Sequence, residues 1–555
     1  MPNTPDSRIV PVLAAAAALL LSSCDRSAID DRPNLLLIVA DDMGYSDAGA
    51  YGGEISTPNI DALAAAGLQL TNFHTAPTCG PTRAMLMTGI DPHPVGMAAN
   101  AAAVARLEAL HGRRGYDGRL NDDAVTVATL LQDAGYQTYI TGKWDLGRAP
   151  GSRASDRGFS RSFVLESAGA SHFADATGSL SIQPRARYLA NGEPVAELPV
   201  DFYSSRSYTD RMIGFINAGD ADKPFFAYMA HTAPHWPLQV PDDWLDRYAG
   251  RYDQGWEATA AARLERQIAL GLFDAVPDYR AARGVSDWSA LDDEKRRREL
   301  RRMEIYAAMI EYMDAEIGRL VDAFDKASGD RPTLVIFMSD NGPEGNAIDR
   351  LGRNAEWIAE TFDQSIDNMG KTGSFVWQGV GWAQVSAQPF RLYKSYVAEG
   401  GIRTPAILRD SRTTSSGRSS SFAVATDIPA TLLDAAGVEH PGDRYGGREI
   451  LPIEGRSLLP LLRDPQRDIH AGDAVGFELY GNRALIRDGW KSLLLWPPEG
   501  DGNWQLYNLQ VDPFERNDLA AEREVLLNEL VNEWHRYADD NSIYLFEQDN
   551  GYGRY

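Results

Sequence analysis

Short apolar runs bounded by turn residues recur along the chain, and stretches with helical spacing separate them. Runs of four to eight residues rich in Val, Ile, Leu and Phe are typical of buried strands. Because strands alternate with helices, we predict an α/β fold whose large, mainly parallel sheet is covered by helices on both faces. The predicted strands are 34–40, 138–140, 224–229, 333–338 and 405–408.

Two helical stretches have clear signals. Residues 59–66 follow Thr57, a suitable N-cap, and Pro58, which suits a first turn. Residues 293–326 show the mixed spacing of a long helix with one half-buried face. We expect both helices to pack against the sheet.

The pattern changes after about residue 462. Residues 484–496 predict a hairpin that turns at Asp488-Gly489, 504–509 predict a further strand, and 522–537 predict a closing helix. A chain of 555 residues exceeds the roughly 250 to 300 residues of a single core. We therefore predict a large α/β domain at 33–462 and a smaller antiparallel α+β subdomain at 463–555.

The N-terminus carries a leader pattern. Arg8 precedes an apolar run, 9–21, that is shorter than the roughly 20 residues of a membrane span and suits a signal peptide. Leu21-Ser-Ser-Cys24 resembles the lipobox of bacterial lipoproteins, where the cysteine is lipidated after cleavage. We expect a signal peptide at 1–23, a linker at 24–32, and export to the periplasm or cell envelope with a lipid anchor at Cys24. Plain secretion with a free Cys24 is the alternative.

The formal net charge of −24 disfavours a nucleic-acid partner and a basic membrane-binding patch. Apart from the anchor, no membrane contact is therefore expected. An anionic substrate would need a few cations gathered at one place.

Polar side chains follow the predicted strands, at the edge where open parallel sheets bind ligands. Asp41 and Asp42 follow the first run, and Asp340 and Asn341 follow the fourth. Three carboxylates and an amide oxygen suit a hard cation such as Ca²⁺ or Mg²⁺. Exposed helix caps are the alternative for either pair alone.

Further polar residues belong to the same edge. Lys143 and Asp145 follow the second run, His231 and His235 follow the third, and Lys394 precedes the fifth. If the sheet is doubly wound, these side chains lie together.

Cys79 begins a predicted helix in which Pro81 suits the first turn and Gly89 ends the helix. Arg83, four positions on, projects to the same side as Cys79. Helix N-termini favour anions. The residues alone leave two interpretations of Cys79 open, an activated thiolate and a buried free cysteine.

These motifs resemble the type I sulfatases, of the bacterial arylsulfatase kind within the alkaline-phosphatase superfamily. Cys79-Gly-Pro-Thr-Arg83 matches the family signature C-x-P-x-R, and similar segments follow in order through nearly all of the mature chain. The resemblance implies that a formylglycine-generating enzyme oxidises Cys79 to formylglycine. The hydrated aldehyde would then attack the sulfur of a small sulfate ester, and release of sulfate would regenerate the aldehyde.

The resemblance also implies roles for the strand-end residues. Asp340 would activate the nucleophile, Arg83 and Lys143 would fix it, and Lys143 would contact the substrate. Lys394 and His235 would bind sulfate and protonate the leaving oxygen. The implied Ca²⁺ ligands, with Mg²⁺ as the alternative ion, are Asp41, Asp42, Asp340 and Asn341.

The chain departs from the family at Asp145. Gly142-Lys-Trp-Asp-Leu-Gly147 stands where the family usually has Gly-Lys-Trp-His-Leu-Gly. That histidine is thought to assist regeneration of the aldehyde. Either Asp145 replaces it, or His231 or His172 fills the gap, or turnover is slow. We favour the first, because a general base needs only reach and a suitable pKa.

We predict an enzyme that cleaves an aryl or alkyl sulfate ester. The alternatives are a phosphonate monoester or phosphodiester hydrolase, which tends to have Asp-His in place of Asp340-Asn341, and a catalytically impaired binding protein, motivated by Asp145. Trp236 and the segment 377–382 are candidates for the wall of a leaving-group pocket, with ordinary core packing as the alternative.

Overall fold

A computed structural model describes residues 30–348, 352–414 and 416–548. Cys24 and the expected signal peptide lie outside these residues, so the predicted export and lipid anchor stay predictions. Within the described ranges, no helix combines the length and apolar character needed to cross a membrane.

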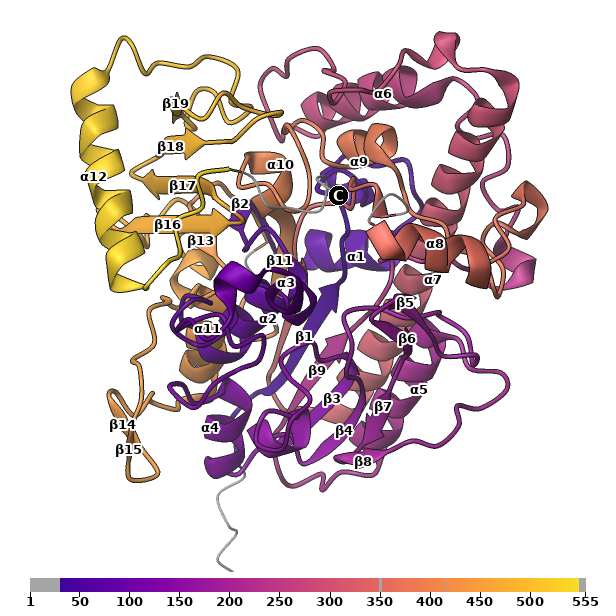
Figure 1. Ribbon diagram of the computed structural model, residues 1–555. Helices are drawn as coiled ribbons and strands as arrows, with labels where there is room; N and C mark the ends of the chain where they lie inside the picture. Colours follow the sequence, from indigo (N-terminus) through magenta and orange to yellow (C-terminus); the bar gives the residue numbers. More distant parts are fainter. Residues whose placement is uncertain (1–29, 349–351, 415, 549–555) are drawn as a thin grey trace, which may run out of the picture.

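An 11-stranded mixed sheet forms the centre of the molecule (Figure 1). Its central strands are parallel, and shorter or antiparallel strands flank them. The expected α/β fold is therefore confirmed, although the strand predicted at 405–408 runs antiparallel to its neighbours. In spatial order the strands are β12 (Gly417–Ser419), β2 (Leu68–His74), β11 (Arg403–Asp410), β10 (Thr333–Ser339), β1 (Asn34–Ala40), β9 (Phe225–Ala230), β3 (Gln137–Lys143), β4 (Arg161–Leu165), β7 (Tyr188–Ala190) and β8 (Glu193–Pro194), while β13 (Ala423–Val424) pairs with β2.

Helices cover both faces of this sheet (Figure 1). α2 (Cys79–Thr88), α4 (Val127–Asp133) and α11 (Asp427–Ala436) pack on one face, and α1 (Pro58–Ala66), α5 (Ser204–Asn217) and α7 (Asp293–Ser328) pack on the other. Leu35 and Leu37 of β1 enter the first core, whereas Leu36 and Ile38 enter the second, and all four are 0% exposed. Burial on both faces explains why this strand is apolar throughout.

The two helices predicted at 59–66 and 293–326 are confirmed as α1 and α7. The capping of α1 differs from the prediction. Thr57 occupies the N-cap position, but its hydroxyl donates to the Asp61 carboxylate and makes no capping bond to a backbone N–H of the helix. Asp314 of α7 caps the helix, because its carboxylate accepts hydrogen bonds from the backbone N–H groups of Asn59 and Ile60 at 3.1 and 2.8 Å.

The C-terminal region forms a separate antiparallel sheet (Figure 1, upper left). The strands are β16 (Ala474–Leu479), β17 (Asn482–Arg487), β18 (Trp490–Leu494) and β19 (Trp504–Asn508), and α12 (Glu524–Asp540) packs against them. The predicted hairpin is confirmed, with left-handed backbone at Asp488 and Gly489. Phe477 and Ile486 join the core that lies under the main sheet, and the division at residue 462 stays a prediction.

A buried group of charges joins the two sheets, and we call it the junction cluster: His74, Arg391, Glu399, Arg403, Lys491 and Glu515. Lys491 Nζ lies 2.8 Å from Glu399 Oε1 and 2.7 Å from Glu515 Oε1. Glu399 also contacts Arg403 at 3.2 Å and His74 at 3.1 Å, and Glu515 contacts Arg391 at 2.8 Å.

The remaining helices and strands lie mainly in the connections and at the rim. They are α3 (Ala101–Arg106), α6 (Gly255–Ala269), α8 (Gly352–Thr361), α9 (Val380–Ser386), α10 (Glu399–Ile402), β5 (Thr177–Leu180), β6 (Gln183–Arg185), β14 (Arg444–Tyr445) and β15 (Arg448–Glu449).

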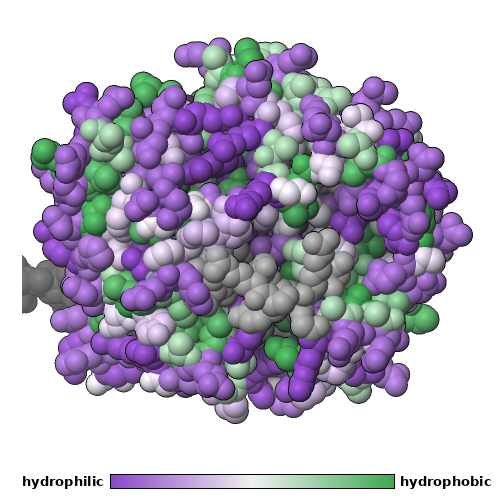
Figure 2. Space-filling model, turned by 45° about the horizontal axis from the view of Figure 1, so that its top comes forward, coloured by the Kyte–Doolittle hydropathy of each residue, from purple (hydrophilic) through white to green (hydrophobic). Residues whose placement is uncertain are grey.

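Figure 2 shows one face of the molecule, where hydrophilic residues predominate and apolar residues lie scattered among them.

Candidate active site

The carboxylates predicted at the strand ends come together at one edge of the sheet. β1 and β10 are parallel and in register at Ala40 and Ser339, so the residues that follow them are neighbours. The backbone N–H of Asp42 donates to Asp340 Oδ1 at 3.1 Å. Asp41, Asp42 and Asp340 are all at most 1% exposed. The expectation of a shared edge is confirmed for these residues.

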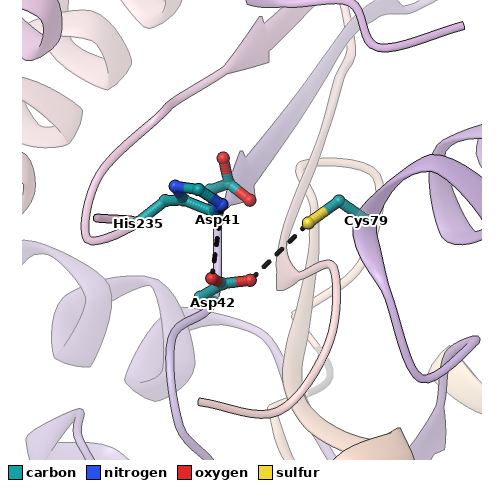
Figure 3. A group of neighbouring side chains, drawn as sticks. All are labelled: Asp41, Asp42, Cys79 and His235. Atoms are coloured by element: carbon teal, nitrogen blue, oxygen red, sulfur yellow. Dashed lines mark hydrogen bonds and ion pairs between the residues drawn. The ribbon is translucent and has the colours of Figure 1, made fainter. Parts of the chain in front are cut away.

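Cys79 lies at the first position of α2, and Gly89 ends this helix in a left-handed conformation, as predicted. Its Sγ atom lies 3.6 Å from Asp42 Oδ1 (Figure 3). Burial raises the pKa of the thiol well above its usual range, although Lys143 and Lys394 oppose this effect. The thiol is therefore protonated and a poor nucleophile, which disfavours the activated-thiolate interpretation.

Each of three buried cations makes its shortest contact with a different carboxylate. Lys143 Nζ lies 3.0 and 2.9 Å from the Asp41 oxygens, and Lys394 Nζ lies 2.8 Å from both oxygens of Asp42. Arg83 donates to Asp340 Oδ2 from Nε and from a terminal nitrogen at 3.1 and 2.8 Å. The local cations that an anionic substrate requires are therefore gathered beside Cys79.

The carboxylates have unequal proton affinities. Burial alone would raise the pKa of Asp42, but the charges of Lys394 and Lys143 outweigh it and hold this pKa below its usual range. Burial and repulsion by Asp41 raise the pKa of Asp340 to about 6, against the attraction of Arg83. Asp340 is thus the better proton acceptor of the two at neutral pH.

His235 lies in the loop after β9 and stacks on Trp236. Its Nδ1 lies 2.6 Å from the Trp236 carbonyl oxygen, which can only accept, so Nδ1 carries a proton. Nε2 lies 3.7 Å from Asp42 Oδ2 (Figure 3). Burial lowers the pKa of His235 well below its usual value, despite the attraction of Asp42. The neutral ring therefore directs the unprotonated Nε2 toward the cluster.

The site fits a divalent cation. One ligand atom from each of Asp41, Asp42, Cys79 and His235 lies within 4.8 Å of the others (Figure 3). Asn341 donates from Nδ2 to Asp42 Oδ1 at 2.6 Å, while its buried Oδ1 has no hydrogen-bond partner. Carboxylate oxygens beside an unfilled amide oxygen are a suitable donor set for a hard cation.

Asp145 differs from the other predicted site residues. It follows β3 with a left-handed backbone, φ 53°, and its side chain makes no hydrogen bond to Cys79 among the contacts of the described residues. Its Oδ2 is buried without a partner, and burial raises its pKa despite Lys143 and Arg83. Asp145 lines a cavity of about 290 Å³ instead of contacting the carboxylate cluster.

The histidines considered as substitutes do not contact the Cys79 thiol. His172 hydrogen-bonds Ser204 Oγ at 2.6 Å and the His235 carbonyl at 3.0 Å, which is a structural role. His231 is fully buried, and neither of its ring nitrogens has a hydrogen-bond partner. Burial lowers the pKa of His231 to about 3, so the ring is neutral at physiological pH.

The tryptophans predicted to wall a pocket divide into two groups. Trp382 lies in the core, whereas Trp236 stacks on His235, so for Trp236 the pocket wall stays a prediction. Trp382 is 0% exposed and lies among Tyr252, Trp256 and Trp288, while Trp236 packs against Phe375. None of these rings lines the cavity beside Asp145.

Two residues at the site were missed by the sequence analysis. Asn100 accepts a hydrogen bond from the Gly80 N–H at 3.1 Å and donates to Thr78 Oγ1 at 3.1 Å, so it holds the chain on both sides of Cys79. Glu344 lies 3.4 Å from Lys394 Nζ. Asn100 lies within an alanine-rich stretch without a motif, whereas Glu344 could have been found four residues after Asp340.

Comparison with known proteins identifies the family. The sulfatase family model matches residues 33–438. The chain belongs to the sulfatase family. An uncharacterized sulfatase of Schizosaccharomyces pombe is 38% identical over 94% of this chain and 96% of its own length. An arylsulfatase of Klebsiella aerogenes is 37% identical over 81% of this chain and 96% of its own length.

Solved structures share the fold of this sulfatase. Ps i-CgsB has a TM-score of 0.65 at 24% identity, covering 93% of this chain and 95% of its own. A structure solved with its substrate D-glucosamine-2-N,6-O-disulfate has a TM-score of 0.59 at 20% identity, covering 92% and 98%. The protein is an enzyme that hydrolyses sulfate esters, and its family implies a metal ion and formylglycine.

Proposed function

We propose that this sulfatase cleaves an aryl or alkyl sulfate ester to an alcohol or phenol and sulfate, using formylglycine derived from Cys79 and Ca²⁺ held by Asp41, Asp42, Asp340 and Asn341. The observation that carries the proposal is the position of Cys79, buried at a helix N-terminus and 3.6 Å from Asp42 Oδ1. When present, formylglycine supplies a hydrated aldehyde as the nucleophile, and the cation supplies Lewis-acid polarisation of a sulfate oxygen.

The buried cations bind and orient the anionic sulfate group. Lys394 and Lys143 already lie within 3.0 Å of carboxylates that flank Cys79, so little movement separates them from a bound sulfate oxygen. Arg83 is held by Asp340 and by the Lys143 carbonyl at 3.1 Å, which keeps the floor of the site rigid. Positioned charges of this kind stabilise a transition state without reorganisation.

Protons are moved by Asp340 and His235. Asp340 accepts the proton of the attacking hydroxyl group. The negative charge of bound sulfate favours a proton on His235 Nε2, because it opposes the burial that keeps the free ring neutral. His235, oriented by the Trp236 carbonyl, then gives this proton to the leaving oxygen.

Asp145 serves as the base that helps to regenerate the aldehyde. Its buried, unpartnered Oδ2 and its position two residues after Lys143 support this role. The pair Asp340-Asn341 favours a sulfate substrate over a phosphonate monoester or a phosphodiester. The lipobox-like segment before Cys24 supports export to the periplasm or cell envelope, and the modified cysteine requires a formylglycine-generating enzyme.

Mass spectrometry of the peptide that contains residue 79, together with a substrate panel, tests the proposal. We expect an aldehyde in place of the thiol in protein from its native host, and faster hydrolysis of sulfate esters than of matched phosphate diesters. An intact Cys79 in active protein would contradict the mechanism, and faster phosphodiester hydrolysis would contradict the substrate class.

Metal titration tests the ligand set separately. After chelation, Ca²⁺ at about 100 times its Kd stabilises the folded state by about 2.7 kcal/mol, because only the folded chain holds the ligands together. Asn341→Leu removes the amide oxygen at similar volume, and we expect weaker Ca²⁺ binding in calorimetry. A Ca²⁺ affinity equal to that of the wild type would show that Asn341 is not a ligand. Tighter binding of Mg²⁺ than of Ca²⁺ would show that Mg²⁺ is the bound ion.

A further inference from the structure

The loop that follows β1 carries two of the proposed metal ligands, and part of its backbone has an unusual conformation. Asp42 has a left-handed backbone, φ 68°, which is costly for residues other than glycine and persists only where the surrounding contacts enforce it. One such contact is the hydrogen bond from the N–H of Met43 to Ser339 Oγ at 3.0 Å. The contacts of the next residues in the loop therefore help to set the direction of the Asp42 carboxylate.

Asp47 closes this loop through its side chain. Its Oδ2 accepts a hydrogen bond from the N–H of Gly44 at 2.8 Å, and the N–H of Asp47 donates to the Gly44 carbonyl oxygen at 3.3 Å. Gly44 packs directly on the end of α9, since a Cβ at this position would lie 2.5 Å from Ser386. Asp47 is 0% exposed, so no water competes for its bonds. Together these contacts fix the turn that begins two residues after Asp42.

Two side chains from α6 and α7 hold the Asp47 carboxylate. Tyr306 of α7 lies with its hydroxyl oxygen 2.7 Å from Asp47 Oδ2 and 3.3 Å from the Asp42 carbonyl oxygen. Because a hydroxyl has a single proton, the shorter contact identifies Asp47 as its main acceptor. Arg263 of α6 donates to Asp47 Oδ1 at 2.6 Å. Asp47 thus connects two helices to the backbone that carries Asp42.

Arg263 has a second acid partner, Glu54. Its Nε and a terminal nitrogen each lie 2.8 Å from an oxygen of Glu54, which also accepts from the hydroxyl of Tyr252 at 2.9 Å. Among the hydrogen bonds and ion pairs of the described residues, Glu54 makes none with residues 41–47. The two carboxylates are therefore a matched pair: both bind Arg263, but only Asp47 also bonds the loop that carries the ligands.

We propose that Asp47, held by Arg263 and Tyr306, is a positioning residue that preorganises the cation site. This inference rests on the proposed function, because it takes Asp42 as a ligand of the cation. Both Asp47 oxygens already accept hydrogen bonds, so Asp47 acts through the backbone of Asp42 and not as a further ligand. Replacing a group that orients a metal ligand typically lowers metal affinity about 10- to 100-fold.

Calorimetric titration of the chelator-treated full-length protein with Ca²⁺ tests the inference without relying on turnover. Asp47→Asn has similar volume, but its amide nitrogen cannot accept the bonds that one carboxylate oxygen takes. We expect the Kd for Ca²⁺ to rise about 10- to 100-fold in this variant. Glu54→Gln is the matched control. It removes the other acid partner of Arg263, so we expect a lower melting temperature and an unchanged Kd.

Tyr306→Phe separates position from charge. It leaves Asp47 ionised and removes the hydroxyl that holds it, so we expect the Kd for Ca²⁺ to rise about tenfold. A rise in Asp47→Asn without any rise in Tyr306→Phe would show that the charge of Asp47 attracts the cation from a distance, and would overturn the positioning role. If Asp47→Asn does not fold, Tyr306→Phe is compared with Tyr252→Phe, which loses only a bond to Glu54 and should keep the wild-type Kd.

Two further results would overturn the inference. They are an unchanged Kd in folded Asp47→Asn, and an equal rise in Kd in Glu54→Gln, because the effect would then come from general loosening of the ion network. Both results leave the proposed ligand set intact. A wild type that binds neither Ca²⁺ nor Mg²⁺ would instead contradict that ligand set, and this inference with it.

Discussion

The candidate-site carboxylates Asp41, Asp42 and Asp340 and the junction cluster are both buried groups of acids and cations, but they differ in how many cationic side chains each carboxylate contacts closely. In the junction cluster Glu399 contacts three cationic or histidine side chains and Glu515 contacts two. In the catalytic cluster each of Asp41, Asp42 and Asp340 has one close cation, and Asn341 Oδ1 lacks a hydrogen-bond partner.

This difference suggests a way to distinguish buried charges that stabilise the fold from buried charges that bind a ligand. Breaking a closed ion network leaves an uncompensated charge and costs stability. A cluster whose carboxylates each have a single close cation has a capacity for a further cation or ligand. Replacing one of its side chains should change binding and rate more than stability. The following predictions test that distinction.

Lys394→Met should have the largest effect on catalysis. Lys394 contacts both oxygens of Asp42, and removing one positioned charge from a site that stabilises developing charge costs about 10²- to 10³-fold in kcat. With Ca²⁺ bound, we expect the midpoint of thermal unfolding to change little. Steady-state kinetics and calorimetry measure both quantities. Normal turnover combined with a large loss of stability would show instead that Lys394 stabilises the fold and is not needed for catalysis.

Lys491→Met should lower the stability of the fold and leave catalysis unchanged. It leaves Glu399 and Glu515 without their shared cation, so the free energy of unfolding falls by about 3 to 5 kcal/mol. Activity per folded molecule should be retained. Denaturant unfolding measures the loss, and Lys223→Met at an exposed position is the control. A change below about 1 kcal/mol would show that the junction cluster is not structural.

Asp145→Ala removes a carboxylate whose Oδ2 is buried without a hydrogen-bond partner, at the edge of the candidate active site. With 4-nitrophenyl sulfate we expect a rapid first release of nitrophenol and then a steady rate lowered about 10²-fold, because regeneration of the aldehyde lacks its base. Stopped-flow absorbance separates the two phases. An unchanged steady rate would exclude Asp145 from regeneration, and a slow first phase would place it in the cleavage step.

His93→Gln should have the smallest effect, and the effect should depend on pH. His93 joins Asp91 to Glu478 of β16 at 2.7 and 3.2 Å, and these carboxylates outweigh burial and raise its pKa to about 9. The raised pKa stabilises the fold fully below about pH 6.5, by up to about 3 kcal/mol, and this contribution is lost as the pH rises through 9. Melting of both proteins at pH 6 and 9.5 should show a difference only at pH 6. A difference in melting temperature of the same size at both pH values would show that the charge on His93 does not stabilise the fold.

The sequence was sufficient to predict the strands that carry the site. The long apolar runs that became β1 and β10 place Asp41, Asp42, Asp340 and Asn341 by topology alone. Pro81 and Gly89 marked α2 through residue types that suit the first turn and the end of a helix. These predictions succeeded because each depends on local pattern and on the parallel arrangement of strands.

The contacts of Asp47 could not be predicted in the same way. The side chains that hold it, Arg263 and Tyr306, lie 216 and 259 residues further along the chain. The capping of α1 by Asp314 was missed because it depends on a contact between segments far apart in sequence. The junction cluster likewise depends on how the two sheets pack, which no local pattern records.

The burial of Cys79 sets an order of events during biosynthesis. With 1% of its surface exposed, Cys79 is out of reach of a modifying enzyme once α2 has packed. The junction cluster is complete only when Lys491 and Glu515 have been made. At 5 to 20 residues per second, synthesis from Cys79 to Glu515 takes roughly 20 to 90 s. Under the proposed function, the conversion of Cys79 to formylglycine therefore has to take place before α2 packs, either during this interval or before the finished chain folds.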